Sequence, residues 1–246
     1  MTDRAAHANS FGPAAEIYER GRPSYPDAAL DWLLPAGQPR VVDLGAGTGK
    51  LTRQVRDRGL SVTAVDPSEG MLTQLRQSVP EVPALVGSAE QIPLPDGSAD
   101  AVLVAQAWHW VDPARAVPEV ARVLSPGGRL GLIWNLRDER ADWVRRLGEI
   151  IGSTEQEREA TIGEPFGPVE IAHFGWTQIL GPERLIDMVA SRSYVILMPA
   201  AERAALLSEV RKLIATHPDL VGRTEFELPY ITECARASLP GASAAS

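Results

Sequence analysis

Val41-Val-Asp-Leu-Gly-Ala-Gly-Thr-Gly49 is the stretch of sequence that decides the fold. Its apolar first residues are typical of a buried parallel strand, and a helical pattern over residues 48–58 follows them. Glycines at alternate positions allow unusual backbone angles and remove every Cβ atom that would hold a ligand away. The start of the helix adds backbone N–H groups that lack helical partners. The stretch therefore predicts a ligand-binding loop at the carboxyl end of a strand.

Two acidic residues indicate the kind of ligand. Asp66 ends the next apolar strand, Val62-Thr-Ala-Val-Asp66, where its carboxylate can accept hydrogen bonds from both hydroxyls of a ribose. Asp43 comes immediately before the glycine loop, and it suits a cationic group such as an ammonium better than a pyrophosphate. The alternative is a glycine turn that only packs the strand on the helix, and the two acids together disfavour it. We expect a nucleoside ligand with a cationic end.

Two commoner nucleotide-binding loops do not fit this sequence. The dinucleotide pattern G-x-G-x-x-G, started at Gly45, requires a glycine where the chain has Lys50. The phosphate-binding pattern G-x-x-x-x-G-K-[ST] requires a glycine at Leu44 and a hydroxyl at Leu51. A dehydrogenase is therefore disfavoured.

Several segments carry a resemblance to a known family. Residues 43–49, together with Ala64-Val-Asp-Pro-Ser-Glu-Gly-Met-Leu72, resemble the class I S-adenosylmethionine-dependent methyltransferases. The nearest subgroup is the small-molecule type related to ubiquinone/menaquinone-biosynthesis and trans-aconitate methyltransferases. Residues 87–98 resemble the adenine-side loop of this family, 100–110 its fourth strand and the exit from it, and 119–128 its helix and turn before strand five. The resemblance is strong over about residues 11–136.

The fold class follows from the pattern and from the resemblance. Apolar strand-like runs alternate with helical patterns, which predicts an α/β protein with a parallel sheet covered on both faces. The resemblance implies a Rossmann-like three-layer sandwich, with a mostly parallel seven-stranded sheet, an antiparallel last strand and a small helical cap. Expected strands cover residues 40–44, 61–65, 82–86, 99–105, 129–134, 170–180 and 226–234. Expected helices cover residues 13–20, 26–34, 48–58, 68–78, 113–123, 138–152, 182–192 and 200–216.

We expect one methyltransferase domain over residues 1–246. Within it, residues 11–34 would form N-terminal lid helices, 38–136 the cofactor-binding core, and 182–198 a candidate cap insertion. The segment 182–198 has no place in the minimal fold.

The resemblance implies S-adenosylmethionine as cofactor and S-adenosylhomocysteine as its product. The implied cofactor-binding residues are Tyr18, Arg22, Asp43, Gly45, Ala46, Gly47, Thr48, Gly49, Asp66, Pro67, Met71, Ser88, Ala89, Glu90, Gln106 and Ala107. Arg22 would pair with the cofactor carboxylate, and its alternative is a surface arginine paired with Asp27. Many relatives have an acidic residue against the adenine amino group. This chain has Ser88 there, so the contact falls to Ser88 or Glu90.

Trp108-His109-Trp110 follows the expected fourth strand. Ligands of open α/β sheets lie at the carboxyl ends of strands, which predicts that this triplet lies near the methyl group. His109 is the candidate catalytic residue, as a base or an orienter of substrate, and the alternative is that the triplet only packs. Substrate-pocket residues are expected to be Tyr25, Trp108, Trp110 and Tyr194.

Composition narrows the class of partner. Acidic residues outnumber basic residues by 32 to 24, and Lys and Arg form no cluster beyond short pairs, so a nucleic-acid substrate is disfavoured. No apolar run approaches the roughly 18 residues that a membrane span needs. The start of the chain lacks the apolar core of a signal peptide, and the single cysteine fits a reducing cytoplasm. The four histidines show no metal-ligand spacing, so we expect no metal.

The sequence thus predicts a cytoplasmic methyltransferase, a monomer or homodimer, acting on a small-molecule acceptor. A protein of another class, a non-catalytic S-adenosylmethionine-binding or regulatory protein on the same fold, remains as the alternative.

Overall fold

The computed structural model describes residues 23–152 and 162–241. Tyr18, Arg22 and the helix expected over residues 13–20 lie outside the described residues. None of the helices within these two ranges is long and apolar enough to cross a membrane.

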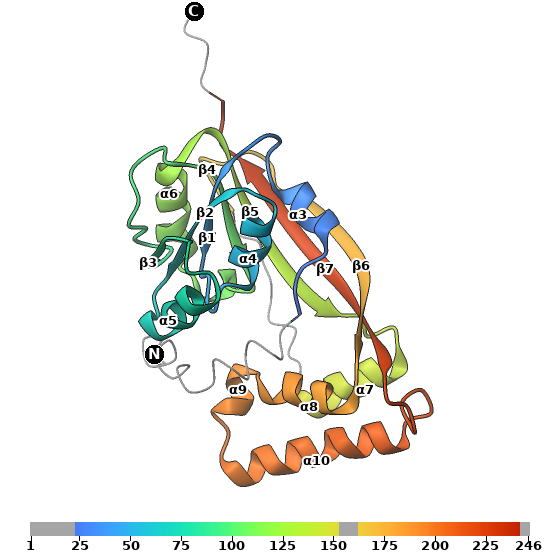
Figure 1. Ribbon diagram of the computed structural model, residues 1–246. Helices are drawn as coiled ribbons and strands as arrows, with labels where there is room; N and C mark the ends of the chain where they lie inside the picture. Colours follow the sequence, from blue (N-terminus) through green and yellow to red (C-terminus); the bar gives the residue numbers. More distant parts are fainter. Residues whose placement is uncertain (1–22, 153–161, 242–246) are drawn as a thin grey trace, which may run out of the picture.

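The described part of the chain contains a seven-stranded sheet in the order β3-β2-β1-β4-β5-β7-β6 (Figure 1). The strands β1 to β5 pair in parallel, whereas β7 is antiparallel to both of its neighbours, β5 and β6. This arrangement confirms the predicted Rossmann-like sheet with an antiparallel last strand. The strands are β1 Arg40–Leu44, β2 Ser61–Asp66, β3 Ala84–Val86, β4 Ala99–Ala105, β5 Leu124–Arg137, β6 Glu170–Leu180 and β7 Phe226–Ser238.

The helices begin and end close to the predicted positions. Ser68 caps α5, accepting a hydrogen bond from the Met71 N–H at 3.4 Å, and Asp112 caps α6, accepting from the Ala114 N–H at 3.1 Å. The described helices are α3 Asp27–Leu33, α4 Lys50–Asp57, α5 Glu69–Ser78, the 3₁₀ helix η1 Trp108–Trp110, α6 Pro113–Val123, α7 Asp142–Ile151, α8 Pro182–Ala190, α9 Ser193–Ile196 and α10 Ala200–Thr216.

The sheet is the middle of three layers. Successive side chains of a strand point to opposite faces. In β1, Val41 packs in a cluster with α3, α4 and α5, while Val42 and Leu44 pack in a cluster with α6. Both faces are therefore covered, as the apolar character of the parallel strands predicts.

The strand β5 is longer than the predicted strand 129–134. Its pairing with β4 is interrupted between Leu124 and Arg129, at the turn that the Pro-Gly-Gly sequence predicts. At its other end, β5 runs past the last residue of β4 and continues to Arg137, because β7 supplies hydrogen-bond partners there. This extension carries side chains of β5 beyond the end of β4, toward the site described below.

A third hydrophobic cluster lies at one end of β6 and β7. The helices α7, α8 and α10 contribute Trp143, Leu185 and Leu213, among others, and β7 contributes Phe226. The rings of Trp143 and Phe226 meet edge to face, with centroids 5.4 Å apart. Figure 1 shows α7 to α10 gathered at one end of the molecule. The helical group is therefore larger than the expected cap insertion 182–198 and includes residues on both sides of β6 in the chain.

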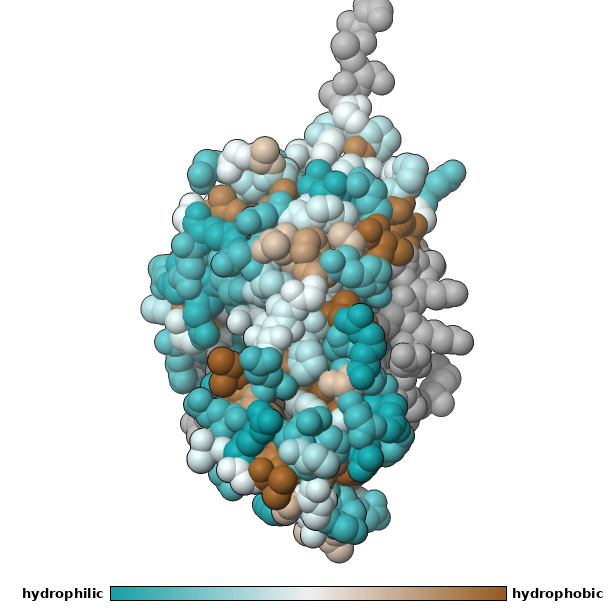
Figure 2. Space-filling model, turned by 90° about the vertical axis from the view of Figure 1, so that its right-hand side faces the viewer, coloured by the Kyte–Doolittle hydropathy of each residue, from teal (hydrophilic) through white to brown (hydrophobic). Residues whose placement is uncertain are grey.

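The strand β6 forms one edge of the sheet. Its side chains alternate between a packed face and an exposed face, and the exposed face carries Ile171 and Ile179. Figure 2 views the side of the molecule on which β6 lies in Figure 1, and its hydrophobic residues form small separate patches among hydrophilic ones.

Candidate functional site

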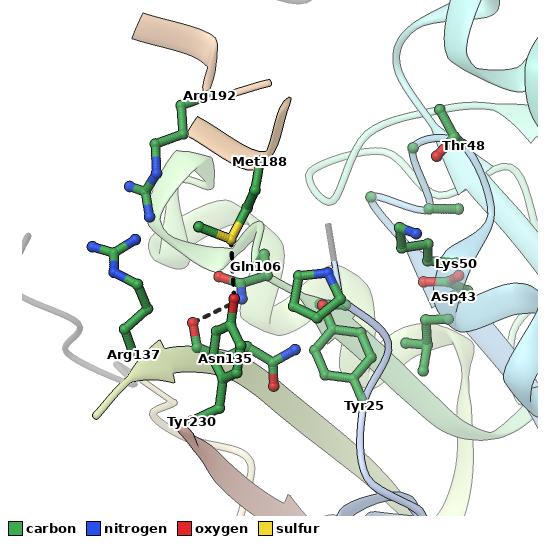
Figure 3. A pocket seen from close by; sticks show the side chains of 16 residues that line it. Tyr25, Asp43, Thr48, Lys50, Gln106, Asn135, Arg137, Met188, Arg192 and Tyr230 are labelled. Carbon is green, nitrogen blue, oxygen red and sulfur yellow. Dashed lines mark hydrogen bonds between the residues drawn. The ribbon is translucent and has the colours of Figure 1, made fainter. Parts of the chain in front are cut away.

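A cavity lies where the carboxyl ends of β1 and β4 meet the extended end of β5, the strand β7 and the segment around α8 (Figure 3). The carboxyl edge of an open parallel sheet is the usual place for a ligand. The cavity is lined by Pro23, Tyr25, Asp43, Gly45, Ala46, Gly47, Thr48, Lys50, Leu51, Ala105, Gln106, Asn135, Arg137, Met188, Arg192 and Tyr230.

The glycine loop has the backbone that its sequence predicts. Gly45 and Gly47 have φ angles of 76° and 55°, a region that residues with a Cβ rarely adopt. A Cβ on Gly45 would lie 2.9 Å from the Cβ of Ala107, whereas one on Gly47 would meet nothing within 4 Å. Gly45 is thus required because the loop packs closely on the chain after β4. Gly47 is required because its own φ angle is positive.

Asp66 holds this loop in place. One carboxylate oxygen accepts a hydrogen bond from the Gly47 N–H, and the other accepts from the Ser68 N–H, each at 2.8 Å. Burial raises the pKa of Asp66, and these two N–H donors act against that rise. Each oxygen keeps a further lone pair that can accept from a ligand hydroxyl.

Asp43 is the buried acid of the cavity. The Thr52 hydroxyl donates to Oδ2 of Asp43 at 2.6 Å, while Oδ1 is buried and has no hydrogen-bond partner within residues 23–152 and 162–241. Burial raises the pKa of Asp43 to about 7; the Thr52 hydrogen bond lowers it, and the nearby Asp66 charge raises it. A buried carboxylate oxygen without a partner on the wall of a cavity fits a cationic ligand group.

Gln106 connects this end of the cavity to β5. It has a φ of 56°, which is uncommon for a residue with a side chain, and such strain is often found at functional sites. Its N–H donates to the Ile133 carbonyl at 2.9 Å, and its side-chain amide donates to the Asn135 carbonyl at 3.3 Å. These bonds hold the strained backbone against β5.

A row of hydrogen bonds supports the cavity wall that is formed by β5 and β7. The Trp176 indole N–H donates to the Thr232 hydroxyl at 2.8 Å, and that hydroxyl donates to Oδ1 of Asn135 at 2.6 Å. Asn135 in turn donates to the Ser24 carbonyl at 3.0 Å. Side chains of β6, β7 and β5 therefore fix the segment in front of α3 at the cavity.

Tyr230 packs between the sheet and the helical group. Its ring stacks on Trp176, with centroids 4.8 Å apart, and its hydroxyl donates to the Met188 sulfur at 3.2 Å. This contact joins β7 to α8 at the cavity wall.

Comparison with known proteins agrees with this geometry. A family model described as a methyltransferase domain matches residues 42–132. The chain is 60% identical to uncharacterized methyltransferase Rv3342 of Mycobacterium tuberculosis over 232 residues, which are 94% of this chain and 96% of that protein. The chain belongs to the class I S-adenosylmethionine-dependent methyltransferases.

Two further methyltransferases resemble the chain over most of its length. It is 33% identical to the uncharacterized methyltransferase-like protein C25B8.10 of Schizosaccharomyces pombe, over 87% of this chain and 90% of that protein. A solved structure of a type II methyltransferase from Anaeromyxobacter dehalogenans matches with a TM-score of 0.68 and 26% identity, covering 89% of this chain and 99% of that one. The similarity thus includes the helical group and the last two strands of this methyltransferase.

The structure brings part of the expected cofactor set together. The expected cofactor residues on the cavity wall are Asp43, Gly45, Ala46, Gly47, Thr48 and Gln106, whereas Asp66 lies outside the lining. Tyr25, which was expected in the substrate pocket, also lies on the wall. Gly49 is the residue before α4 and lies behind the loop, where a Cβ would come within 2.8 Å of Leu75. Ala107 packs on the loop at Gly45.

The residues expected on the adenine side lie outside the cavity lining. Ser88 pairs with Gln91 through the backbone, and its hydroxyl bonds to the Glu90 carboxylate. Glu90 also accepts from the Asp112 N–H at 3.0 Å. Both candidates for the adenine contact are thus bonded to each other, so the structure favours neither of them.

The other three expected residues of this region differ in burial. Met71 and Ala89 are buried, and Pro67 is exposed. Ala89 belongs to the hydrophobic cluster under α6.

The tryptophan-histidine triplet is not part of the cavity lining. Trp108–Trp110 forms η1, in which Trp108 points into the core and is only 2% exposed, while Trp110 is 51% exposed. His109 is also exposed and lies beside Trp110, with ring centroids 4.8 Å apart. The short helix therefore turns the imidazole toward the surface rather than toward Asp43.

Tyr194, which was expected in the substrate pocket, does not line the cavity. Its hydroxyl donates to the Ile151 carbonyl at 2.7 Å, which joins α9 to the end of α7. Asp27, the expected alternative partner of Arg22, forms an ion pair with Arg58.

Several residues of the cavity lining were not predicted from the sequence. Asn135 and Arg137 could have been found, because they follow the predicted fifth strand just as the triplet follows the fourth. Met188, Arg192 and Tyr230 lie far from any cofactor motif, and no local pattern in the sequence marks them as cavity residues.

Within the described ranges, no group of three or more His, Cys, Asp or Glu residues could hold a metal ion.

Proposed function

We propose that this methyltransferase transfers the methyl group of S-adenosylmethionine to a small-molecule acceptor. The single observation that carries the proposal is the shape of the cavity. The glycine loop and Asp43 share it with side chains from β5, β7 and the segment around α8. Donor and acceptor would therefore meet in one partly enclosed space rather than on an open groove.

The residues present fit the methyl donor. S-adenosylmethionine carries an ammonium and a ribose. The buried Oδ1 of Asp43 offers an acceptor for the ammonium, and Asp66 keeps lone pairs for the ribose hydroxyls. The absence of side chains at Gly45 and Gly47 lets the donor approach the backbone of the loop closely.

Methyl transfer requires little acid–base catalysis by the protein. When bound, the donor supplies an electrophilic methyl group: a lone pair of the acceptor forms the new bond to carbon, and the electrons of the carbon–sulfur bond return to sulfur. The protein then has to align the two reactants and exclude water. Tyr25, Gln106 and Met188 are suited to this task, because they line the space between the loop and the β5–β7 wall.

A non-catalytic binding protein on the same fold is the second candidate. The glycine loop and the buried Asp43 would serve donor binding in either case. Only turnover distinguishes the two functions.

The test has two measurements. Calorimetry measures binding of S-adenosylmethionine and S-adenosylhomocysteine, and incubation of the protein with methyl-labelled donor and a small-molecule metabolite extract measures transfer. We expect both donor forms to bind and label to move into a low-mass product. The variant Gly45→Val, which places side-chain atoms against Ala107, should abolish both results.

Other outcomes are informative. Donor binding without transfer to any metabolite fraction would favour the binding protein. Failure of both donor forms to bind would contradict the proposal itself.

A further inference from the structure

The two ends of the cavity carry different charged groups. Asp43 and Lys50 lie at the end formed by the glycine loop, and the guanidinium groups of Arg137 and Arg192 lie at the other end (Figure 3). Gln106 and Tyr230 lie between these ends in the same view. One end of the cavity thus has a buried acid next to a lysine, whereas the other end has two arginines and no acid in the lining.

Arg137 is available for a ligand. It is the last residue of β5, and its Nε atom is buried without a hydrogen-bond partner in the described residues. The neighbouring acid, Asp138, does not neutralise the charge of Arg137, because Asp138 accepts hydrogen bonds from Arg140 at 2.8 and 3.0 Å. A buried guanidinium N–H that is left without an acceptor is costly, and a bound anion would supply one.

Arg192 reaches the same place from a different element. It follows the buried Ser191 at the end of α8, where the Ser191 hydroxyl donates to the Met188 carbonyl at 2.8 Å. The Arg192 N–H donates to the Val189 carbonyl at 3.2 Å. These backbone contacts fix the start of the Arg192 side chain at the cavity wall.

We propose that Arg137 and Arg192 together hold a carboxylate or phosphate group of the methyl acceptor. This inference rests on the proposed function. Guanidinium groups match the geometry of both oxyanions, and two of them converging from separate elements can bind one anion from two sides. The sources of this anion, a carboxylic acid or a phosphate ester, share the same chemistry of recognition.

The methyl donor itself does not account for these arginines. Its carboxylate and its ammonium are attached to the same carbon atom, so an ammonium at Asp43 keeps the carboxylate near the glycine loop. The arginines lie at the opposite end of the cavity, beyond Gln106 and Tyr230. They therefore face a different molecule, the acceptor.

The anchoring group is distinct from the reacting atom. An oxyanion between two guanidiniums has its lone pairs engaged in hydrogen bonds, which makes it a poor nucleophile. The acceptor should thus be a bifunctional small molecule, with an oxyanion at Arg137 and Arg192 and a second group directed toward Gln106 and the loop.

The first experiment measures anion binding to the protein saturated with S-adenosylhomocysteine. The probes are succinate, citrate, inorganic phosphate and glycerol 3-phosphate, with succinamide as the neutral control. We expect at least one anion to bind and succinamide not to bind. The variants Arg137→Gln and Arg192→Gln should each weaken that binding by about 10- to 100-fold, as expected for the loss of charged hydrogen bonds. The relative affinities of carboxylates and phosphates distinguish the two sources.

The controls separate this inference from the proposed function. Arg76→Gln removes an arginine that lies outside the cavity lining and pairs with Glu69, and it should leave anion binding unchanged. The affinity of Arg137→Gln and Arg192→Gln for S-adenosylhomocysteine should stay within about two-fold of the wild type, which also shows that the variants fold. Loss of that affinity would assign the arginines to the donor and overturn the inference. If the wild type fails to bind S-adenosylhomocysteine, the proposed function fails instead.

A second experiment needs no choice of probe. A metabolite extract is separated by anion exchange before reaction, and each fraction is incubated with labelled donor and enzyme. Label should enter a product of the retained, anionic fraction only. If the acceptor is found in the unretained fraction, or if none of the anions binds, the inference is wrong.

Discussion

The two ends of the cavity are built in different ways. The end that we assign to the methyl donor consists of the loop after β1 and the start of α4, and Asp66 at the end of β2, the next strand in the chain, holds this loop. The acceptor end combines the end of β5, the middle of β7 and the residues around the end of α8, with α7, β6 and α10 between them in sequence. The comparison indicates that the donor end is a local property of the chain, whereas the acceptor end depends on the packing of the helical group on the sheet.

The largest effect is expected at the donor end, for Gly45→Val. The new side chain would clash with Ala107 and would require a branched residue at a φ of 76°. We expect the affinity for S-adenosylhomocysteine to fall by more than about 100-fold and stability to fall by about 3 kcal/mol. Calorimetry and chemical denaturation measure the two effects.

The matched control for this change is Gly59→Ala. Gly59 has a φ of 74°, but a Cβ there meets nothing within 4 Å. It should cost about 1 kcal/mol of stability through its backbone angle alone, with donor affinity unchanged. Equal effects of the two variants on donor affinity would mean that the loop does not contact the donor.

Asp66→Ala should weaken donor binding by about 1.5–3 kcal/mol, the usual value for hydrogen bonds to a charged group. The change also removes the acceptor of the Gly47 and Ser68 N–H groups. Titration with S-adenosylhomocysteine measures the affinity. An unchanged affinity would mean that the ribose lies elsewhere.

Asp43→Asn tests the burial of this acid through the pH dependence of the free energy of unfolding. The pKa of Asp43 is raised to about 7 by burial, so the folded protein holds a proton that the unfolded chain has lost between about pH 4 and pH 7. The free energy of unfolding of the wild type should therefore fall as the pH rises through this window, by at most about 1.4 kcal/mol per pH unit. The amide of the variant has no such proton, so the variant should lack this decline and gain stability relative to the wild type toward pH 7.

Donor affinity should change with pH in the opposite direction to the stability. The ionised Asp43 attracts the donor ammonium, so the affinity of the wild type should rise between about pH 5.5 and pH 7.5, and that of Asp43→Asn should be lower and nearly flat. Denaturation and calorimetry at several pH values across this range test both statements. Parallel stability profiles of the two proteins would contradict the assignment of the titrating group.

Thr232→Val tests the acceptor end without touching the loop. The change removes the hydroxyl between Trp176 and Asn135 and leaves both groups without a partner, at a cost of about 1–3 kcal/mol. We expect a higher KM for the acceptor and a donor affinity within about two-fold of the wild type. Loss of donor affinity would show that the two ends of the cavity are not independent.

His109→Ala should have the smallest effect. The imidazole is exposed and lies outside the cavity lining, so kcat should stay within about two-fold of the wild type. A catalytic base would instead contribute about 10²- to 10⁴-fold, with donor affinity retained. A decrease in kcat of that size, measured by steady-state kinetics, would indicate that His109 takes part in catalysis.

The sequence by itself determined the sheet, most helix boundaries and the donor loop. Glycine spacing, the acids near the ends of β1 and β2 and the apolar runs act within one strand-loop-helix unit, where neighbours in the chain are also neighbours in space. Only the tertiary structure decided the acceptor end. Apolar periodicity predicts that α8 buries one face, but not that Met188 and Arg192 meet β5 and β7. The same holds for Trp108 and His109, because only a three-dimensional turn decides which side chain enters the core and which faces solvent.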